Sequence, residues 1–144
     1  MIEFAKRQVL SGALAAIVLI AFGSLAAAAD KPYSVAVENG SAKVGADSQI
    51  RVTVTAAEGW FANFRYAHKL DNLSAGGGAE LAFKSVRASS AAGRTIVYTL
   101  GVRPTAPGVH KVTGDILFSL TRGKEVVTEK LPLAATVTGD KAGS

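Results

Sequence analysis

The stretch from Gly59 to His68 holds the residue types best suited to recognition or chemistry. Read with the two-residue period of a strand, its aromatic side chains fall on both faces, with Trp60, Phe64, Tyr66 and His68 on one and Phe61, Asn63 and Arg65 on the other. In a layered β domain one face fills the core and the other is at least partly exposed. Aromatic and Arg side chains dominate binding hot spots. The candidate partner-binding residues are therefore an exposed Phe61/Arg65 or Tyr66/His68 pair, and the alternative is a core Trp60 with shielded neighbours.

The chain carries no recognisable catalytic motif. Acyl transfer needs a nucleophile with a base in reach, yet no Gly-x-Ser-x-Gly elbow occurs. Glycoside hydrolysis needs two carboxylates that flank one bond, and most acids here fall at turns or at polar strand positions. The run Gly76-Gly77-Gly78 lacks the Gly-Lys-Ser/Thr of a phosphate loop, so it reads as a connection between strands. We therefore expect no catalytic residues and no enzymatic activity.

The sequence contains few residues that could bind a metal or a cofactor. There is no cysteine, which excludes thiolate sites and disulfides, and the two histidines, His68 and His110, lack converging ligand spacing. His68, Tyr66 and Asp71 form the one plausible cluster, which keeps a periplasmic small-ligand or metal carrier as the alternative function. His110 follows Pro107-Gly108, where many sandwich domains carry a Tyr that ties a corner to upstream backbone, so we expect a structural hydrogen bond there. No metal and no cofactor are expected.

The first 29 residues have the pattern of a secretory signal peptide. Lys6 and Arg7 precede the apolar stretch Val9 to Leu25, and Ala27-Ala28-Ala29 supplies the small side chains that a signal peptidase needs before Asp30. The alternative is an uncleaved anchor, because about 20 helical residues cross a bilayer core. A lipoprotein is excluded by the absence of cysteine. The pattern predicts a periplasmic or secreted protein that meets the membrane only transiently, unless the segment is retained.

The formal charge of +5 is scattered along the chain rather than gathered in a basic run. Nucleic-acid binding is not expected, since it requires a concentrated basic patch. A solvated basic surface explains the charge, and a weak, salt-sensitive attraction to anionic lipid or polysaccharide is the functional alternative. The sequence leaves the oligomeric state open.

Turn signals separate segments that alternate apolar and polar residues, which is the strand period. We expect a first strand at Tyr33 to Val37 with a tight turn at Asn39-Gly40, and a corner at Pro104 to Gly108. Pro132 predicts that the last strand is interrupted or peripheral. The other expected strands are Ile50–Val54, Trp60–His68, Ala79–Val86, Ile96–Val102, Val112–Leu120 and Glu125–Thr138.

About seven strands in some 110 residues predict an all-β, antiparallel, immunoglobulin-like two-sheet sandwich, with a closed barrel as the alternative. The expected organisation is a signal peptide at 1–29, a β-sandwich domain at 30–138 and a flexible tail at 139–144.

The run from Val35 through Leu120 resembles exported bacterial immunoglobulin-like domains, among them the N-terminal domains of periplasmic thiol-reductase proteins of the DsbD kind. The shared features are the aromatic segment after Glu58-Gly59 and the Pro107-Gly108-Val109-His110 corner that leads into Gly114–Ser119. Cysteines follow in the redox members, but Leu120-Thr121-Arg122 follows here, so the thiol chemistry is not implied. The resemblance implies a docking or accessory module. We therefore expect an exported, non-enzymatic module that binds a partner protein or a cell-envelope component.

Overall fold

The computed structural model describes residues 31–141, so the predicted signal peptide lies outside the described residues. The described chain is all-β and has no helix. Its strands are β2 (Tyr33–Glu38), β3 (Gly40–Lys43), β4 (Ser48–Ala56), β5 (Phe61–Ala62), β6 (Lys69–Ala75), β7 (Ala79–Leu81), β8 (Val86–Arg87), β9 (Ser90–Ala92), β10 (Thr95–Pro104), β11 (Gly108–Arg122) and β12 (Glu125–Asp140).

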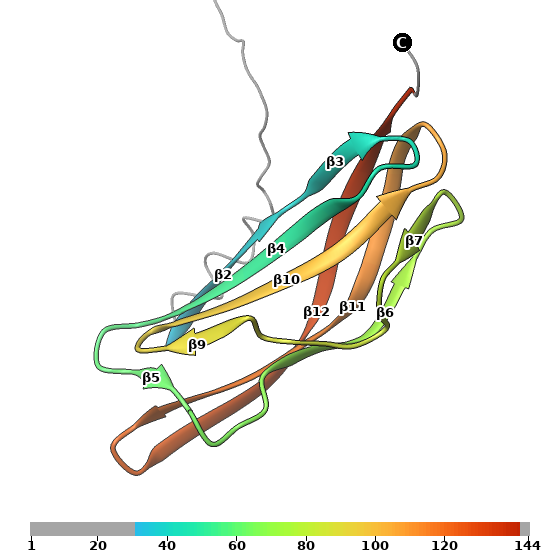
Figure 1. The fold of residues 1–144 in the computed structure, drawn as a ribbon. Helices are drawn as coiled ribbons and strands as arrows, with labels where there is room; N and C mark the ends of the chain where they lie inside the picture. Colours follow the sequence, from blue (N-terminus) through green and yellow to red (C-terminus); the bar gives the residue numbers. More distant parts are fainter. Residues whose placement is uncertain (1–30, 142–144) are drawn as a thin grey trace, which may run out of the picture.

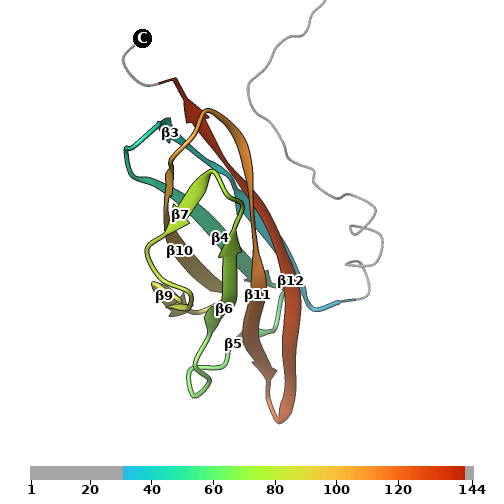
Figure 2. The ribbon, with the colours of Figure 1, turned by 90° about the vertical axis from the view of Figure 1, so that its right-hand side faces the viewer.

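The strands form two sheets that face each other (Figures 1 and 2). The first sheet has the order β2-β4-β10-β7, with β9 also paired to β10. The second has the order β3-β12-β11-β6-β8, with β5 also paired to β11. All pairings are antiparallel except that of β3 with β12. This is the order of an immunoglobulin-like sandwich, so the predicted fold class is confirmed.

The core lies between the sheets and is built from alternate strand positions. In β4 the aliphatic residues Ile50, Val52 and Val54 are fully buried, while the residues between them face outward. β10 pairs with β4 and buries its own alternate residues, including Tyr98, whose hydroxyl donates to the Leu117 carbonyl at 2.9 Å. That bond joins the two sheets and satisfies the polar atom of a buried ring.

The expected hairpin turn at Asn39-Gly40 is wrong, because the chain changes sheets there. β2 pairs with β4 in the first sheet, and β3 then runs parallel to β12 in the second. The Asn39 side chain accepts the Thr136 N–H at 2.9 Å, which fastens the crossing point to β12. A Cβ on Gly40 would lie 2.8 Å from the Gln49 carbonyl oxygen, so the close approach explains the glycine.

The single strand expected at Ala79–Val86 is also wrong. It divides into β7, which pairs with β10 in the first sheet, and β8, which pairs with β6 in the second. Residues 82–85 cross between the sheets along one side of the sandwich. Alternation alone predicts strands but carries no information on which sheet each half joins.

The last strand was expected to be interrupted or peripheral at Pro132, and the structure shows the second outcome, because β12 is continuous there. Pro132 lies opposite Asp115 of β11, and β3 reaches β12 only from Val137 onward. At Pro132, the side of β12 that faces away from β11 therefore has no strand partner among the described residues. The missing N–H of the proline costs no hydrogen bond between strands there. β12 continues to Asp140, two residues beyond the expected end.

Candidate binding site at one end of the sandwich

The β11–β12 hairpin projects beyond the first sheet and forms one end of the molecule, opposite the end at which β12 finishes (Figures 1 and 2). The strands are joined by Gly123 and Lys124, and Gly123 has a φ of 60°, as a two-residue hairpin loop requires. Arg122 pairs with Glu125 across the hairpin at 2.7 Å. The same guanidinium lies 4.7 Å from the centre of the Trp60 ring. Trp60 itself is buried, so it is a core residue, as the alternative with a core Trp60 expects.

The aromatic strand predicted from Trp60 to His68 is wrong. Only Phe61 and Ala62 are extended, pairing with Thr121 and Leu120 of β11. A β-turn follows at Asn63, where the Tyr66 N–H donates to the Asn63 carbonyl at 3.0 Å. The Asn63 side chain also accepts the Arg65 N–H at 3.1 Å. These local bonds offer the backbone an alternative to a strand ladder, and they outweigh the β propensity of the aromatic residues.

The turn is fixed to the second sheet through Asn63. Its backbone N–H donates to the Ser119 carbonyl at 2.9 Å, and its side-chain amide donates to the Ser119 hydroxyl at 3.2 Å. The Ser119 oxygen also accepts the Thr128 hydroxyl at 3.1 Å, which extends the network to β12. Phe64 and Arg65, the two central residues of the turn, are thus held on a rigid base. The role of Asn63 and Ser119 in this base was not predicted, although an Asn that begins a turn is a local signal for such a structure.

His68 is the centre of that base and not part of the surface. It is 5% exposed, Nδ1 lies 3.3 Å from the Ser119 N–H, and Nε2 lies 3.0 Å from the Asn63 carbonyl oxygen. Because Nδ1 accepts a hydrogen bond from the Ser119 N–H, Nε2 carries the hydrogen of the neutral ring and donates to the Asn63 carbonyl. Burial lowers the pKa of His68, and the bond to Asn63 opposes that shift in part. His68 therefore cannot contact a partner, which corrects its predicted place in the binding surface.

We expect the stability of the protein to fall on mild acidification because of His68. Its pKa in the fold lies below the ordinary value of 6.5, so below pH 6.5 the unfolded chain takes up a proton first. The contribution of His68 is complete above pH 6.5 and is lost as the pH falls through the lowered pKa. Urea unfolding of the wild type and of His68→Gln, measured at several pH values, isolates this effect. If the unfolding free energies of the two proteins change with pH in the same way, His68 is not the cause of the loss.

Three exposed apolar side chains and one exposed cation lie on β5, on the turn that follows it and at the start of β12. Phe61 is 51%, Phe64 83% and Val126 58% exposed. Phe61 and Val126 are both opposite Thr121 in the strand register, so Phe61, Thr121 and Val126 lie in one row on the outer face of the sheet. Phe64 belongs to the turn that follows β5. The Arg65 guanidinium lies 5.6 Å from the centre of the Phe64 ring. We call Phe61, Phe64, Arg65 and Val126 the tip patch.

The tip patch contains two of the four predicted residues and two that the sequence analysis missed. Phe61 and Arg65 belong to it, Tyr66 is half-buried beside the His68 ring at 5.3 Å, and His68 is buried. Phe64 was assigned to the same face as Trp60, an assignment that fails because the segment turns. Val126 reaches the patch only through the pairing of β12 with β11, which no local pattern could have indicated.

The structure does not assemble the metal or ligand cluster of the carrier alternative. Both His68 nitrogens are bonded to backbone groups, and Asp71 lies on β6 with its carboxylate 3.7 Å from Lys69. Hydrogen bonds from the Asn72 backbone, Ser85 and Lys69 lower the pKa of Asp71, with the Asn72 backbone contributing most. Within residues 31–141, no three His, Cys, Asp or Glu side chains gather in a way that could hold an ion.

His110 has the structural role that the sequence analysis assigned to it. Its Nε2 lies 2.7 Å from the Ala106 carbonyl oxygen, four residues upstream, which closes the corner between β10 and β11. Gly78, in the turn between β6 and β7, packs against the ring so closely that a Cβ there would overlap it. The Gly78 carbonyl also accepts the Thr105 N–H at 2.7 Å. The glycine run is therefore a connection between strands, as expected, and it also packs against this corner.

An open hollow lies on the first sheet, away from the tip patch. Neither His68 nor His110 lines it, and Arg103, one of its lining residues, is paired with Asp47 at 3.0 Å. The residues lining it are Asp47, Ser48, Gln49, Glu80, Leu81, Ala82, Gly101, Val102 and Arg103.

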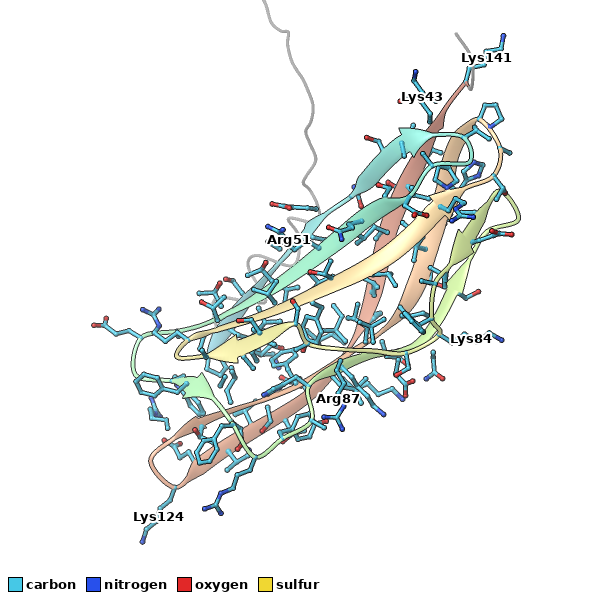
Figure 3. All side chains as sticks on the ribbon, in the orientation of Figure 1. Lys43, Arg51, Lys84, Arg87, Lys124 and Lys141 are labelled. Atoms are coloured by element: carbon cyan, nitrogen blue, oxygen red, sulfur yellow. The ribbon has the colours of Figure 1, made fainter. Side chains whose placement is uncertain are left out.

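Basic side chains are spread over the whole molecule, as the sequence indicates. In Figure 3, Lys124 lies at the hairpin end, while Lys43 and Lys141 lie at the opposite end. Arg51 lies on one side of the sandwich, and Lys84 and Arg87 lie on the other. These six cations therefore do not line up in one basic stripe of the kind that nucleic-acid binding requires. No helix within residues 31–141 has the length and apolar character to cross a membrane.

Neither a family model nor a curated protein matches this chain. Among solved structures, the chain is similar to AggA, the major subunit of aggregative adherence fimbriae type I from Escherichia coli. The TM-score is 0.39 and the sequence identity 11%, over 76% of this chain and 95% of that chain. A likeness at this level carries no assignment of function. The resemblance to DsbD-type domains stays a prediction from the sequence.

Proposed function

We propose that the protein is an exported, non-enzymatic β-sandwich module that binds a component of the cell envelope through the tip patch. The observation that carries the proposal is the Asn63 turn, which holds Phe64 and Arg65 in one geometry at the end of the domain. A Phe that is 83% exposed on a rigid turn has no role in the core of the domain. Rigid aromatic and Arg side chains are the groups that contribute most to binding.

Two further features support binding at this end. The residues beneath the patch, Asn63, His68 and Ser119, satisfy one another's polar groups, so the turn requires no rearrangement before a partner arrives. Phe61 and Val126 add two exposed apolar side chains on β5 and β12, and they supply surface from which a partner would exclude water. Export rests on the N-terminal segment, whose apolar run and Ala27-Ala28-Ala29 signature predict it.

Binding to isolated bacterial envelopes tests the proposal. We expect a Phe64→Ala, Arg65→Ala double variant to bind at least tenfold more weakly than the wild type in a co-sedimentation titration, because loss of a hot-spot pair costs more than about 1.4 kcal/mol. The matched control is Phe83→Ala, Arg87→Ala, which removes an exposed Phe and an exposed Arg on another side of the sandwich. Equal affinity of the two double variants would contradict the proposed role of the tip patch.

The carrier alternative gains no support from the geometry. His68 and His110 are each bonded to backbone carbonyls, and they lie in different parts of the fold. We therefore retain the binding module as the proposed function.

A further inference from the structure

The chain enters the domain at the end that bears the tip patch. The Pro32 carbonyl accepts the Ala57 N–H at 2.8 Å, and Ala57 begins the connection that leads to Phe61. Lys31 lies 4.0 Å from Glu129 of β12, and the Tyr33 hydroxyl donates to the same carboxylate at 2.9 Å. The point at which the N-terminal segment joins the domain is thus fixed beside the hairpin rather than at the opposite end.

The length of chain before Lys31 limits how far this end can lie from a membrane. The apolar run ends at Leu25, and only residues 26–30 separate it from Lys31. Six residue steps span at most about 20 Å even when fully extended. While the apolar run occupies a bilayer, during export or as a retained anchor, the sandwich end with the tip patch is therefore held close to the lipid surface.

The chemistry of this end suits such a surface. Its side chains include five cations, Lys31, Arg65, Arg94, Arg122 and Lys124, and three carboxylates, Glu58, Glu125 and Glu129, which leaves two net positive charges. Arg122 is paired with Glu125 and Lys31 with Glu129. Arg94 donates to the Ala56 carbonyl, so Arg65 and Lys124 are the cations outside these contacts. Phe61, Phe64 and Val126 supply apolar area among these charges. Apolar side chains that enter the headgroup region, flanked by cations that contact phosphates, are the usual composition of an interfacial membrane contact.

We propose that the tip patch rests on the anionic lipid surface of the membrane that the Val9–Leu25 segment enters. This inference rests on the proposed function and names its ligand as phospholipid headgroups. Phe64 enters the boundary between headgroups and acyl chains. Arg65 stays at the phosphates, because its long side chain can place the charge in the polar layer while the aliphatic part lies deeper. The contact would orient the domain with its hairpin end toward the bilayer.

Vesicle binding by residues 30–144 tests the inference without the apolar segment. Both sheets and the core lie within residues 31–141, and circular dichroism verifies the fold of each variant. We expect tighter co-sedimentation with vesicles of equal parts phosphatidylglycerol and phosphatidylcholine than with phosphatidylcholine alone. Phe64→Ser should weaken that binding about tenfold, as loss of a partly inserted Phe implies. Arg65→Gln should weaken it about fivefold at low salt, the expected contribution of one cation.

Phe83→Ser and Arg87→Gln are the matched controls, and both should bind vesicles as the wild type does. The lipid inference is overturned if the wild-type protein does not bind the phosphatidylglycerol vesicles. It is also overturned if the Phe64→Ser variant binds them with the same affinity as the wild type. If binding to whole envelopes still requires Phe64 in that case, the proposed function stands and the ligand is another envelope component, such as a protein. If neither vesicles nor envelopes distinguish Phe64→Ser from wild type, both the inference and the proposed function are wrong.

Discussion

A Phe118→Ala variant is expected to lose about 3–5 kcal/mol of unfolding free energy, the usual cost of deleting a buried aromatic ring. Phe118 is fully buried on β11, and its ring meets the Tyr33 ring edge-on with 5.0 Å between centroids. That contact joins the first strand of one sheet to a central strand of the other. The cavity would therefore weaken the packing of β2 as well as the core itself.

Chemical denaturation of Phe118→Ala and Phe83→Ala measures this effect with the same substitution at two sites. Phe83 is 68% exposed, so its removal should change the unfolding free energy by no more than about 0.5 kcal/mol. Similar losses for the two variants would mean that the sheets do not face each other through Phe118.

A His68→Ala variant is expected to lose about 2–4 kcal/mol of unfolding free energy and to loosen the Asn63 turn. Removing the ring leaves the buried Ser119 N–H without its acceptor, which alone costs about 1–3 kcal/mol, and it also leaves a void. The Asn63 carbonyl loses its bond to Nε2 as well. Hydrogen exchange at the Arg65 and Tyr66 amides, which both donate to Asn63, should become faster.

His68→Gln provides the control for this prediction. The Gln side-chain oxygen can accept the Ser119 N–H, and its amide can donate to Asn63, so this variant should recover part of the lost stability. An alanine variant as stable as the wild type, with unchanged exchange at Arg65 and Tyr66, would show that His68 does not hold the turn.

The regular strands could be predicted from the sequence because their signal is local. Ile50–Val54 and Ile96–Val102 alternate strictly, and each falls within a strand, β4 and β10, that buries its aliphatic face. The corner from Pro104 to Gly108 could also be predicted, because β10 ends at the proline and β11 begins at the glycine. Such patterns fixed the fold class, because two apolar sheet faces must cover each other.

The connections and the supports of the site could not be predicted, because their partners are distant in sequence. Asn39 reads as a hairpin turn residue, but its side chain bonds Thr136, 97 residues away. His68 lies in a predicted strand whose exposed face the sequence leaves open, and its burial follows from a bond between its ring and the Ser119 amide, 51 residues away. Asn63 is the exception, because its signal is local: an Asn that begins a turn can accept the N–H two residues on, and here that bond prevails over the strand preference of the neighbouring aromatics. Long-range pairing therefore decided which of the predicted residues reached the surface.

The most direct test of the account is the mobility of a spin label beside the Asn63 turn. The protein contains no cysteine, so Ala67→Cys and Phe83→Cys each create a single labelling position. Ala67 is exposed beside the turn and lies outside the tip patch, so the label leaves Phe64 and Arg65 in place. Electron paramagnetic resonance spectra are then recorded before and after isolated envelopes are added. We predict that the label at position 67 becomes immobilised while the label at position 83 stays mobile. A label at position 67 that remains as mobile with envelopes as without them would contradict the proposed binding.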